Sequence, residues 1–385
     1  MAKVAHPEFG ELASDTAPAR LTVRAWRACR SAGDTARWDV LALRAREPNP
    51  FFESWYLLPS LTALDPEGSV VLAVLERDGE WLGLMPLVRA RRYYRWPVPQ
   101  LRNWVHANTF LGAPLVAKGH EAAFWRALIA HADGAAGTAL FLHLAGLPLD
   151  GALHEALMAV LGESGRRHGV VYREDRALLR SGLAPEAYLE AALAGKKRKE
   201  LRRQYARLAE QGALAVVRQH DAAGLDGWTA QFLALEAAGW KGKAGSALAC
   251  APETAALFGE ALKGAAARGR LERLMLTLDG APIAMLATFL TAPGAFSYKT
   301  AFDERLARFS PGVLLQRENL ALLERPGIDW CDSCAAADHP MIDHLWRERR
   351  AVGRVSVALG GTLRRAGFAA LLHTELGRRP AGVVT

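Results

Sequence analysis

Apolar and polar positions alternate along this chain in blocks that predict two β-hairpins. Apolar runs at 70–75 and 81–88 flank Asp78-Gly79, and similar runs at 271–276 and 283–290 flank Asp279-Gly280. Asp-Gly between two apolar runs is a strong hairpin signal, because both residues tolerate the positive φ angles of a tight turn. The sequence therefore predicts one hairpin in each half of the chain.

The same order of elements is predicted around both hairpins. In the first half, the pattern predicts helices at 36–46 and 52–64, then, after the hairpin, a strand at 100–105, a helix at 122–132, a strand at 139–144, a helix at 152–164 and a strand at 169–174. In the second half, the corresponding elements are helices at 222–238 and 252–268, then a strand at 295–302, a helix at 311–324, a strand at 328–331, a helix at 341–350 and a strand at 352–358.

This repeated order predicts an α/β (α+β) protein made of two tandem units. Each unit is expected to be a mixed sheet flanked by helices, with a cleft between the two units. The predicted limits are 20–180 for the first unit and 181–376 for the second. The alternative is two unrelated α/β domains, since short strings of elements can match by chance.

Composition indicates a soluble globular protein with a preference for acidic partners. The 385 residues are 51% hydrophobic and 23% charged, with a formal net charge of +8. Such a charge favours nucleic acid, anionic lipid or a phosphorylated cofactor without choosing among them. The longest apolar stretch, 283–290, is far shorter than the ~20 residues of a membrane helix, and residues 1–16 carry acids and no apolar core. We expect no signal peptide and a cytoplasmic protein that is at most peripheral to the inner membrane.

The four cysteines give no disulfide framework and fit a reducing compartment. Cys331 and Cys334 form a CxxC pair, and His339 and His344 follow. A second ligand pair at a suitable spacing is missing, and so is the sequence context of a redox helix. We expect a buried structural pair and no metal.

Residues 298–312 contain the most specific candidate for a ligand site. A strand is predicted to end there, and Ser310-Pro311-Gly312 then begins a helix, with Ser as N-cap and Pro at the first position. The amides after Gly312 would be free to hold a phosphate or diphosphate. The alternative is an ordinary helix start. The candidate cofactor-binding residues are Arg308, Ser310, Gly312 and Val313.

A basic helix is predicted between the two units. Its cations are Lys196, Lys197, Arg198, Lys199, Arg202, Arg203 and Arg207. Such a run is typical of a solvated helix face, and it can also contact the phosphates of a cofactor, a lipid headgroup or RNA. Because Tyr205 is the one aromatic residue within the run, base stacking has little support and nucleic acid is an unlikely partner.

Several segments together resemble a known family. They are 49–53 (NPFFE), 199–203 (KELRR), 235–242 (LEAAGWKG), 298–304 (YKTAFDE) and 310–312 (SPG). From 22 to 376 the chain resembles the CelD-like branch of the GNAT acyltransferase superfamily, whose members carry two fused GNAT units and are related to the Fem peptidoglycan aminoacyl transferases. The resemblance departs from the usual diphosphate loop, because Phe309 and Leu314 stand where Gln or Arg and a small residue are typical.

The resemblance implies transfer of an acyl group from acyl-CoA to an amine. Bacterial ceramide synthases of this branch join a long-chain acyl-CoA to a sphingoid amine, and a sphingoid base is the preferred acceptor here. One alternative is a Fem-like transferase that uses aminoacyl-tRNA. Another is a protein of exopolysaccharide or cellulose synthesis that acts on an amino sugar or only binds.

An amine that attacks a thioester needs a base, a group that stabilises the oxyanion, and a thiolate that can leave. Candidates for the base are Glu236, Asp303 and His339, and Tyr298 is a candidate acid for the thiolate. Each also has a structural interpretation: a surface pair for Glu236, a turn residue for Asp303, a packed ring for His339 and a β-former for Tyr298.

Candidate substrate-binding residues come from both units. Lys241 and Lys299 can hold phosphate or stabilise the oxyanion, and His106 lies in an aromatic-polar loop, 104–110, that can face the cleft. The basic-aromatic run 91–96 precedes this loop. Such a run suits an anionic membrane surface, and it equally suits a sheet edge guarded by charge, which we prefer.

Overall fold

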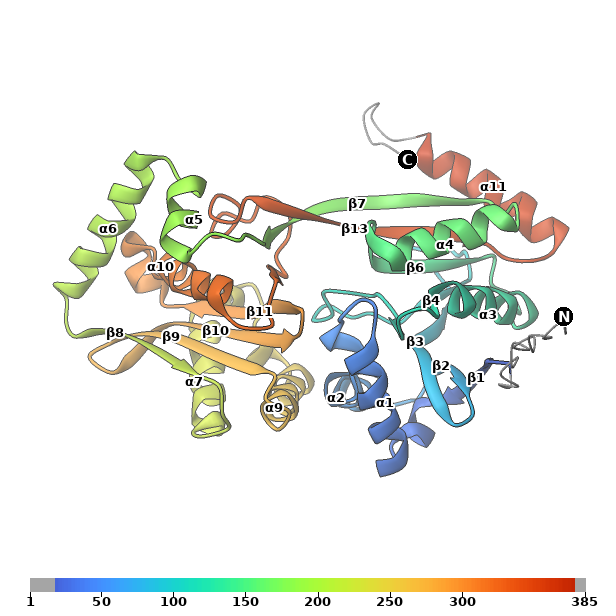
Figure 1. Cartoon of the computed structure of the whole chain (residues 1–385), viewed down its shortest axis with the longest axis horizontal. Coiled ribbons are helices and arrows are strands. Elements are labelled where there is room, and N and C mark those ends of the chain that lie inside the picture. Colours follow the sequence, from blue (N-terminus) through green and yellow to red (C-terminus); the bar gives the residue numbers. More distant parts are fainter. Residues whose placement is uncertain (1–17, 378–385) are drawn as a thin grey trace, which may run out of the picture.

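In the computed structural model, residues 18–377 are described, and they form one continuous sheet of 13 strands with helices on its two faces (Figure 1). The segment 1–16, for which no signal peptide is expected, lies outside the described residues. Below, residues 18–180 are called the first half and residues 181–377 the second half.

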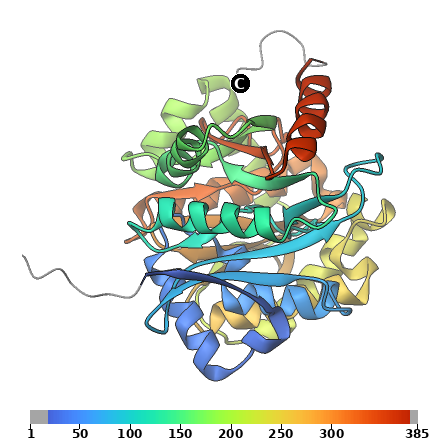
Figure 2. The ribbon, with the colours of Figure 1, turned by 90° about the vertical axis from the view of Figure 1, so that its right-hand side faces the viewer.

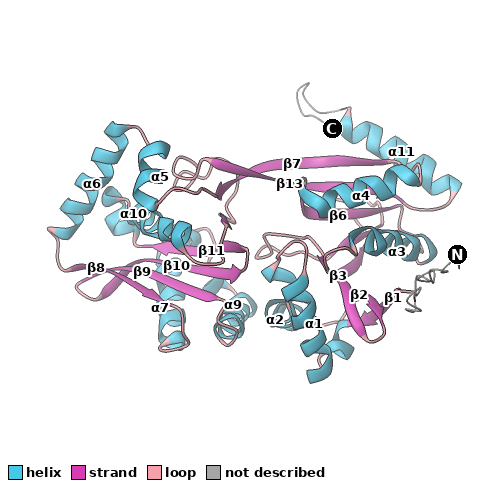
Figure 3. Cartoon of the chain, viewed as in Figure 1, coloured by secondary structure: helices cyan, strands magenta, loops and turns pink. Residues whose placement is uncertain are grey.

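The strands run through both halves (Figure 3). They are β1 (Arg20–Ala25), β2 (Val71–Arg77), β3 (Glu80–Ala90), β4 (Gln100–Asn103), β5 (Leu115–Val116), β6 (Phe141–Pro148), β7 (His168–Leu179), β8 (Leu214–Gln219), β9 (Leu271–Leu278), β10 (Ala281–Thr291), β11 (Gly294–Phe302), β12 (Trp330–Asp332) and β13 (Glu348–Ala358).

The helices lie between the strands in the order that the sequence predicts, with a few additions and without the helix predicted at 341–350. They are α1 (Ala32–Arg44), α2 (Ser54–Leu64), α3 (Glu121–Gly134), α4 (Gly151–Glu163), α5 (Pro185–Ala192), α6 (Gly195–Ala209), α7 (Leu225–Ala238), α8 (Trp240–Lys243), α9 (Pro252–Ala266), α10 (Pro311–Glu318) and α11 (Thr362–Leu376). Short 3₁₀ segments are η1 (Trp26–Cys29), η2 (Pro50–Phe52), η3 (Leu248–Cys250), η4 (Glu304–Phe309) and η5 (Asn319–Glu324).

The two halves exchange their last strands. The sheet order is β1-β2-β3-β4-β6-β13-β7-β12-β11-β10-β9-β8, so β13 from the second half lies between β6 and β7, and β7 from the first half reaches β12. Figure 1 shows β7 and β13 bridging the two halves. The predicted mixed α/β fold is confirmed. The predicted unit limits, 20–180 and 181–376, stay a prediction, and this exchange is a feature that element order alone does not contain.

Helices cover both faces of the sheet, and one helix pair joins the halves. In the first half, α1 and α2 lie on one face and α3 on the other, as Figure 2 shows from the side. Helices α2 and α9 pack directly against each other. Gly264 makes this close approach possible, because an added Cβ atom would lie 2.9 Å from the Cβ of Trp55. The hydrophobic core of the first half therefore continues into the second.

Both predicted hairpins are confirmed. β2 and β3 are joined by Asp78-Gly79, and β9 and β10 by Asp279-Gly280. All four turn residues have positive φ angles, between 50° and 80°, which is the geometry of the two-residue turns that suit a twisted hairpin.

The helix predicted at 341–350 is wrong. Residues 340–345 form turns, and β13 begins at Glu348. The apolar spacing that suggested a helix is real, because Ile342, Leu345 and Trp346 are all buried in the core of the second half. Two short turns bury the same residues, so the spacing by itself does not require a helix.

Candidate active site

The main candidate site is a cavity where two parallel strands of the second half separate. β11 and β12 pair from Gly294–Trp330 to Phe296–Asp332, and there this ladder ends. Beyond that point the chain leaves β12 through Cys334, which has a φ of 52°. The cavity has a volume of about 270 Å³ and is lined by residues 297–302 of β11 and residues 333–336 after β12. It is called the second-half cavity below.

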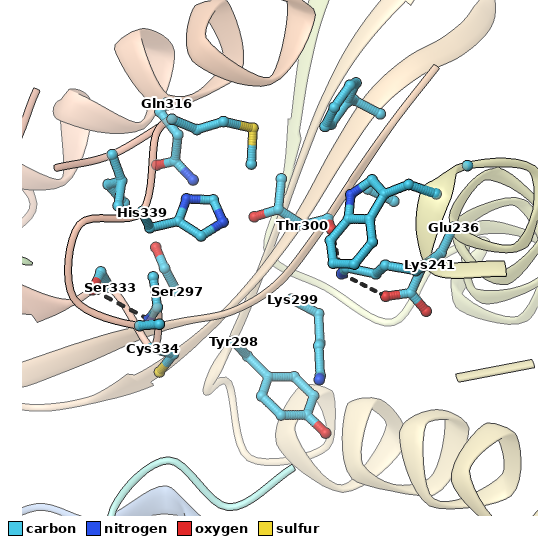
Figure 4. A pocket seen from close by; sticks show the side chains of 18 of the residues that line it. Glu236, Lys241, Ser297, Tyr298, Lys299, Thr300, Gln316, Ser333, Cys334 and His339 are labelled. Carbon is cyan, nitrogen blue, oxygen red and sulfur yellow. Dashed lines mark hydrogen bonds and ion pairs between the residues drawn. The ribbon is translucent and has the colours of Figure 1, made fainter. Parts of the chain in front are cut away.

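Residues from several elements face this cavity. Figure 4 shows Glu236 and Lys241 on one side and His339 and Cys334 on the other, with the strand that carries Tyr298 and Lys299 between them. The predicted residues Glu236, Tyr298, Lys241, Lys299 and His339 are therefore brought together. Their roles as acid, base or substrate contact stay predictions.

Glu236 and Lys241 form a fixed ion pair at the junction of α7 and α8. The ammonium of Lys241 lies 2.8 Å from Glu236 Oε1 and also donates to the carbonyl of Thr300 at 3.2 Å. The second oxygen of Glu236 accepts the Leu248 amide at 2.8 Å. Since the carboxylate is 3% exposed and both its oxygens are occupied, Glu236 holds Lys241 against β11. A further proton acceptor role would require this arrangement to break.

Lys299 and Tyr298 connect the cavity to the first half. The ammonium of Lys299 donates to Asn108 Oδ1 at 2.7 Å, and the Tyr298 hydroxyl lies 3.2 Å from that of Tyr56. Burial, together with the charge of Lys241, lowers the pKa of Lys299 to about 8. Burial raises the pKa of Tyr298, so its phenol stays protonated at neutral pH.

His339 is the group best suited to accept a proton in this cavity. Burial and the charge of Lys241 lower the pKa of His339 below 6.5, so the imidazole is neutral near pH 7. Its Nδ1 atom is buried and has no hydrogen-bond partner. A neutral ring with a free nitrogen can take a proton from a bound amine.

The predicted anion site at the start of α10 does not have the expected geometry. Ser310 has a φ of 54°, and its side chain caps no amide; its hydroxyl instead accepts a hydrogen bond from Gln204. The amides of Val313 and Leu314 both donate to the Ser310 carbonyl. The expectation of free amides after Gly312 is therefore wrong for this turn.

Gly312 is covered by side chains. An added Cβ atom would lie 2.6 Å from Met341 Sδ and 3.3 Å from the Phe302 ring. Both covering residues line the second-half cavity, whereas Arg308, Ser310, Gly312 and Val313 do not. Gly312 thus lies behind the cavity wall, and the cofactor-binding role of the four residues stays a prediction.

Asp303 also lies outside the second-half cavity. It caps the 3₁₀ segment η4 by accepting the Arg305 amide at 2.9 Å, and its carboxylate lies 2.7 Å from the Arg305 guanidinium. Hydrogen bonds from the Arg305 side chain lower the pKa of Asp303. These contacts fit the alternative interpretation of Asp303, a turn residue.

His106 lines a different cavity, in the first half. This cavity, of about 290 Å³, is called the first-half cavity below; it is lined by residues of the loop 105–112, β6, β7 and β13. Phe110 lines both cavities. The sequence predicts that the loop 104–110 can face a cleft, but it carries no signal for Arg176 of β7, which also lines the first-half cavity.

The CxxC pair is buried, as the sequence predicts. Cys331 and Cys334 are free thiols, each less than a tenth exposed. Cys331 lies 3.7 Å from the Ser297 hydroxyl. Burial raises the pKa of both thiols, so neither is a reactive thiolate at neutral pH.

The basic-aromatic run 91–96 is a turn between β3 and β4. Tyr94 and Trp96 are 59% and 51% exposed. The ladder of β3 with β2 ends at Leu87 and that with β4 at Ala90. The run therefore lies beyond both ladders, and its interpretation as a guarded edge stays a prediction. None of the helices within 18–377 is long and apolar enough to cross a bilayer.

A family comparison bears on the second half directly. Residues 195–340 match the model described as "Acetyltransferase (GNAT) domain". This range includes α6 and all of β11. The predicted GNAT fold is confirmed. The GNAT match also supports the coarser functional prediction, a GNAT-type acyltransferase. No curated protein sequence matches the chain.

Solved structures are similar over most of the chain. FemX has a TM-score of 0.55 at 11% identity and covers 88% of this chain and 98% of its own. The C-terminal domain of a protein assigned as a lysylphosphatidylglycerol synthetase, from Agrobacterium fabrum, has a TM-score of 0.53 at 13% identity, over 89% and 96%. A protein of unknown function from Bacteroides thetaiotaomicron has a TM-score of 0.52 at 13% identity, over 85% and 97%. At these identities the likeness is one of fold.

Proposed function

We propose that this protein is an N-acyltransferase that moves an acyl group from acyl-CoA to an amine in the second-half cavity. The observation that carries the proposal is the unpaired edge of β11. Residues 297–302 continue beyond the end of the β11–β12 ladder and line the cavity together with Lys299 and His339. An open strand edge offers backbone donors and acceptors to an extended ligand, as a neighbouring strand would.

His339 is the proposed base. The amine nitrogen attacks the thioester carbonyl carbon, and the proton that the nitrogen loses passes to the neutral imidazole of His339. The carbon–sulfur bond then breaks, and the same proton leaves with the thiolate as a thiol. One proton is transferred and returned, so the step needs no other reactant.

Lys299 is the proposed stabiliser of the oxyanion. Lys299 lines the cavity, and its ammonium is held by Asn108. With a pKa of about 8 it is largely charged at pH 7, and a partly buried positive charge favours the negative oxygen of a tetrahedral intermediate. Tyr298 is a poor acid because its pKa is raised, so we assign it a packing role beside Tyr56.

The apolar lining suits a long-chain amine as the acceptor. Leu235, Phe302 and Ile342 line the cavity, and Trp240, 54% exposed, lies at its wall. A sphingoid base, the acceptor predicted from the resemblance, has an amine for the reaction and a chain for such a surface. Contact with an anionic membrane would bring this acceptor to the protein, and the exposed turn 91–96 is the proposed contact.

Screening donors against acceptors tests the proposal. Release of free thiol from acetyl-, decanoyl- and palmitoyl-CoA is measured with sphinganine, glucosamine and amino acids as acceptors. We expect sphinganine with a long-chain donor to react fastest. Reaction with glucosamine alone would favour the exopolysaccharide interpretation, and donor binding without thiol release would favour a protein that only binds.

Aminoacyl-tRNA is the second candidate donor, because a basic surface adjoins the site. The cations of α6 include Arg202, Arg203 and Arg207, for which no ion pair is present among the described residues, and α6 contacts the turn before α10 through Gln204 and Ser310. The same helix can contact the phosphates of CoA or of RNA. Transfer from aminoacyl-tRNA, with no transfer from any acyl-CoA, would establish this alternative.

A further inference from the structure

We propose that the first-half cavity is a second binding site, for a ligand that carries a carboxylate or a phosphate. This site is separate from the proposed acyl transfer, and its argument depends on buried donors that lack acceptors. The cavity begins where the parallel pairing of β4 and β6 ends, at Arg102–His143. It therefore occupies the place in the first half that the second-half cavity occupies in the second.

Arg176 supplies the first unpaired donors. Its side chain is 4% exposed, and Nη1 donates to the Phe110 carbonyl at 2.7 Å. Nη1 also lies 3.8 Å from Asp332 Oδ1, and Nε lies 3.6 Å from Glu174 Oε1, which is too long for a good hydrogen bond. Nη2 and Nε have no hydrogen-bond acceptor. Leaving such a buried charged donor unsatisfied is costly, so an acceptor from outside the protein would stabilise it.

His106 supplies another donor at the same cavity. Its Nδ1 accepts the amide of Asn108 at 3.3 Å. Burial and the charge of Lys299 lower its pKa to about 3, so the ring is neutral and carries its proton on Nε2. Nε2 is buried and has no partner. Both buried side chains therefore present N–H groups, and an oxyanion is the ligand type that accepts from them.

Charged groups of both signs lie in and behind the lining of the first-half cavity. Arg354 lines the cavity, with its guanidinium 4.6 Å from the centre of the Tyr172 ring. Glu174 is the acid in the lining. Asp332 lies behind Arg176, and its Oδ2 atom is also 3.4 Å from Nη1 of Arg350. Arg350 forms a further ion pair with Glu47. The lining itself holds two arginines and one carboxylate, and with Arg350, Asp332 and Glu47 behind it the charges balance. The unsatisfied donors of Arg176, and not a surplus of positive charge, therefore favour an anion.

A second acyl donor is not the expected occupant, because the strand edge in this half is closed. The amide side chain of Asn103 donates to the carbonyls of Ala145 and Gly112, and its oxygen accepts the Ala145 amide. The Gly112 amide donates to the Gly146 carbonyl at 2.8 Å. These bonds use the backbone groups of β6 that an extended ligand would need. Side chains, and not a strand edge, therefore define this site.

Binding of small anions to the full protein tests the proposal. Inorganic phosphate and succinate are titrated separately by calorimetry in a buffer with little competing anion, while the His106 Nε2 signal is followed by ¹⁵N NMR. We expect saturable binding at one site, with a shift of the His106 signal that follows occupancy. Stronger binding of phosphate points to a phosphorylated ligand, and stronger binding of succinate to a carboxylate ligand.

Variants separate this site from the general basic surface. Arg176→Gln should weaken binding on the order of tenfold or more, equivalent to about 1.4 kcal/mol. Because Arg176 is buried and its loss can affect folding, Arg354→Gln is the second variant, expected to weaken binding several-fold at an unchanged melting temperature. Matched controls are Arg126→Gln, an exposed arginine paired with Glu163, and Arg203→Gln on α6. No saturable binding, a His106 signal that does not move, or equal losses in the controls would overturn the proposal.

Discussion

The ammonium of Lys299 donates a 2.7 Å hydrogen bond to Asn108 Oδ1, and this bond joins β11 to a loop of the first half. The Asn108 carbonyl also accepts from Tyr56, whose hydroxyl lies 3.2 Å from that of Tyr298. The candidate site is therefore built by both halves, although the cavity itself lies in the second. Activity is expected to depend on the contact between the halves as well as on β11.

Replacing His339 tests the proposed base. His339→Gln keeps the size and polarity but cannot accept a proton, so kcat should fall by roughly 10²–10⁴-fold. Because burial and the charge of Lys241 lower the pKa of His339, the fall of kcat/KM on the acid side that belongs to this imidazole should lie below the range of an ordinary histidine. His344→Gln, an exposed neighbour, is the matched control and should retain full activity. An active His339→Gln would remove His339 from the mechanism.

Lys299 makes stability depend on pH in a defined window. Its pKa is about 8 in the fold and 10.5 as an ordinary lysine. Between these values the unfolded chain holds a proton that the folded chain lacks, so the free energy of unfolding rises with pH. Below pH 8 Lys299 is charged in both the folded and the unfolded chain, so burial of its charge lowers the free energy of unfolding by the full amount. Urea unfolding of native protein and Lys299→Met should differ by an amount that changes between pH 8 and 10.5.

An exposed lysine controls for general effects of pH. Lys118→Met changes a residue at the surface, and its difference from the native protein should stay constant across the same window. A constant difference for Lys299→Met as well would mean that the ammonium is not buried as described.

Replacing Gly312 tests whether the side chain of Met341 fills the space at the start of α10 where a diphosphate was predicted. A Cβ atom there would meet Met341 Sδ at 2.6 Å, so Gly312→Ala should destabilise the protein by roughly 1 kcal/mol. In a double-mutant cycle with Met341→Ala, we expect a coupling of similar size. Gly227→Ala is the control, because nothing lies within 4 Å of its added Cβ in helix α7, and it should stabilise. Additive effects at 312 and 341 would contradict the packing.

Phe51 is expected to hold the two halves together. Its fully buried ring contacts Phe110 from the first half and Phe289, Phe296 and Tyr298 from the second, at centroid distances of 5.6 to 6.3 Å. Phe51→Ala should lower the free energy of unfolding by about 3–5 kcal/mol, measured by urea titration. Leu363→Ala, 89% exposed, should change it by less than ~0.5 kcal/mol. If Phe51→Ala lowers the free energy of unfolding by as little as Leu363→Ala does, this aromatic cluster does not join the halves.

The fold could be predicted from the sequence wherever its signals were local. Asp-Gly by itself favours the positive φ angles of a tight turn, so the turns at 78–79 and 279–280 could be predicted locally. Most of the order of helices and strands follows from the spacing of apolar residues. The exchange of β7 and β13 is a pairing between distant segments, and nothing in either strand alone specifies the partner. Ile342, Leu345 and Trp346 have helical spacing, but no helix forms at these residues. Turns place the same side chains in the core, so their burial does not require a helix.

The candidate site was only partly predictable. Glu236, Lys241, Tyr298, Lys299 and His339 were found because polar residues near a strand end or a glycine-rich corner suggest chemistry, and the fold brings them to one cavity. The turn at Ser310 was mispredicted because its sequence is that of a good helix cap. In the fold, Gly312 of this turn is covered by Met341, which is distant along the chain, and by Phe302 at the end of β11. Arg176 was missed, since a single arginine in a strand carries no signal until its missing partners are seen.

Hydrogen–deuterium exchange with and without palmitoyl-CoA tests the central claim, that the donor lies along the open edge of β11. The account predicts slower exchange at residues 297–302 when donor is bound, with little change at residues 144–148 of β6, where Asn103 already closes the edge. Unchanged exchange at 297–302 under saturating donor, or protection confined to other strands, would contradict it.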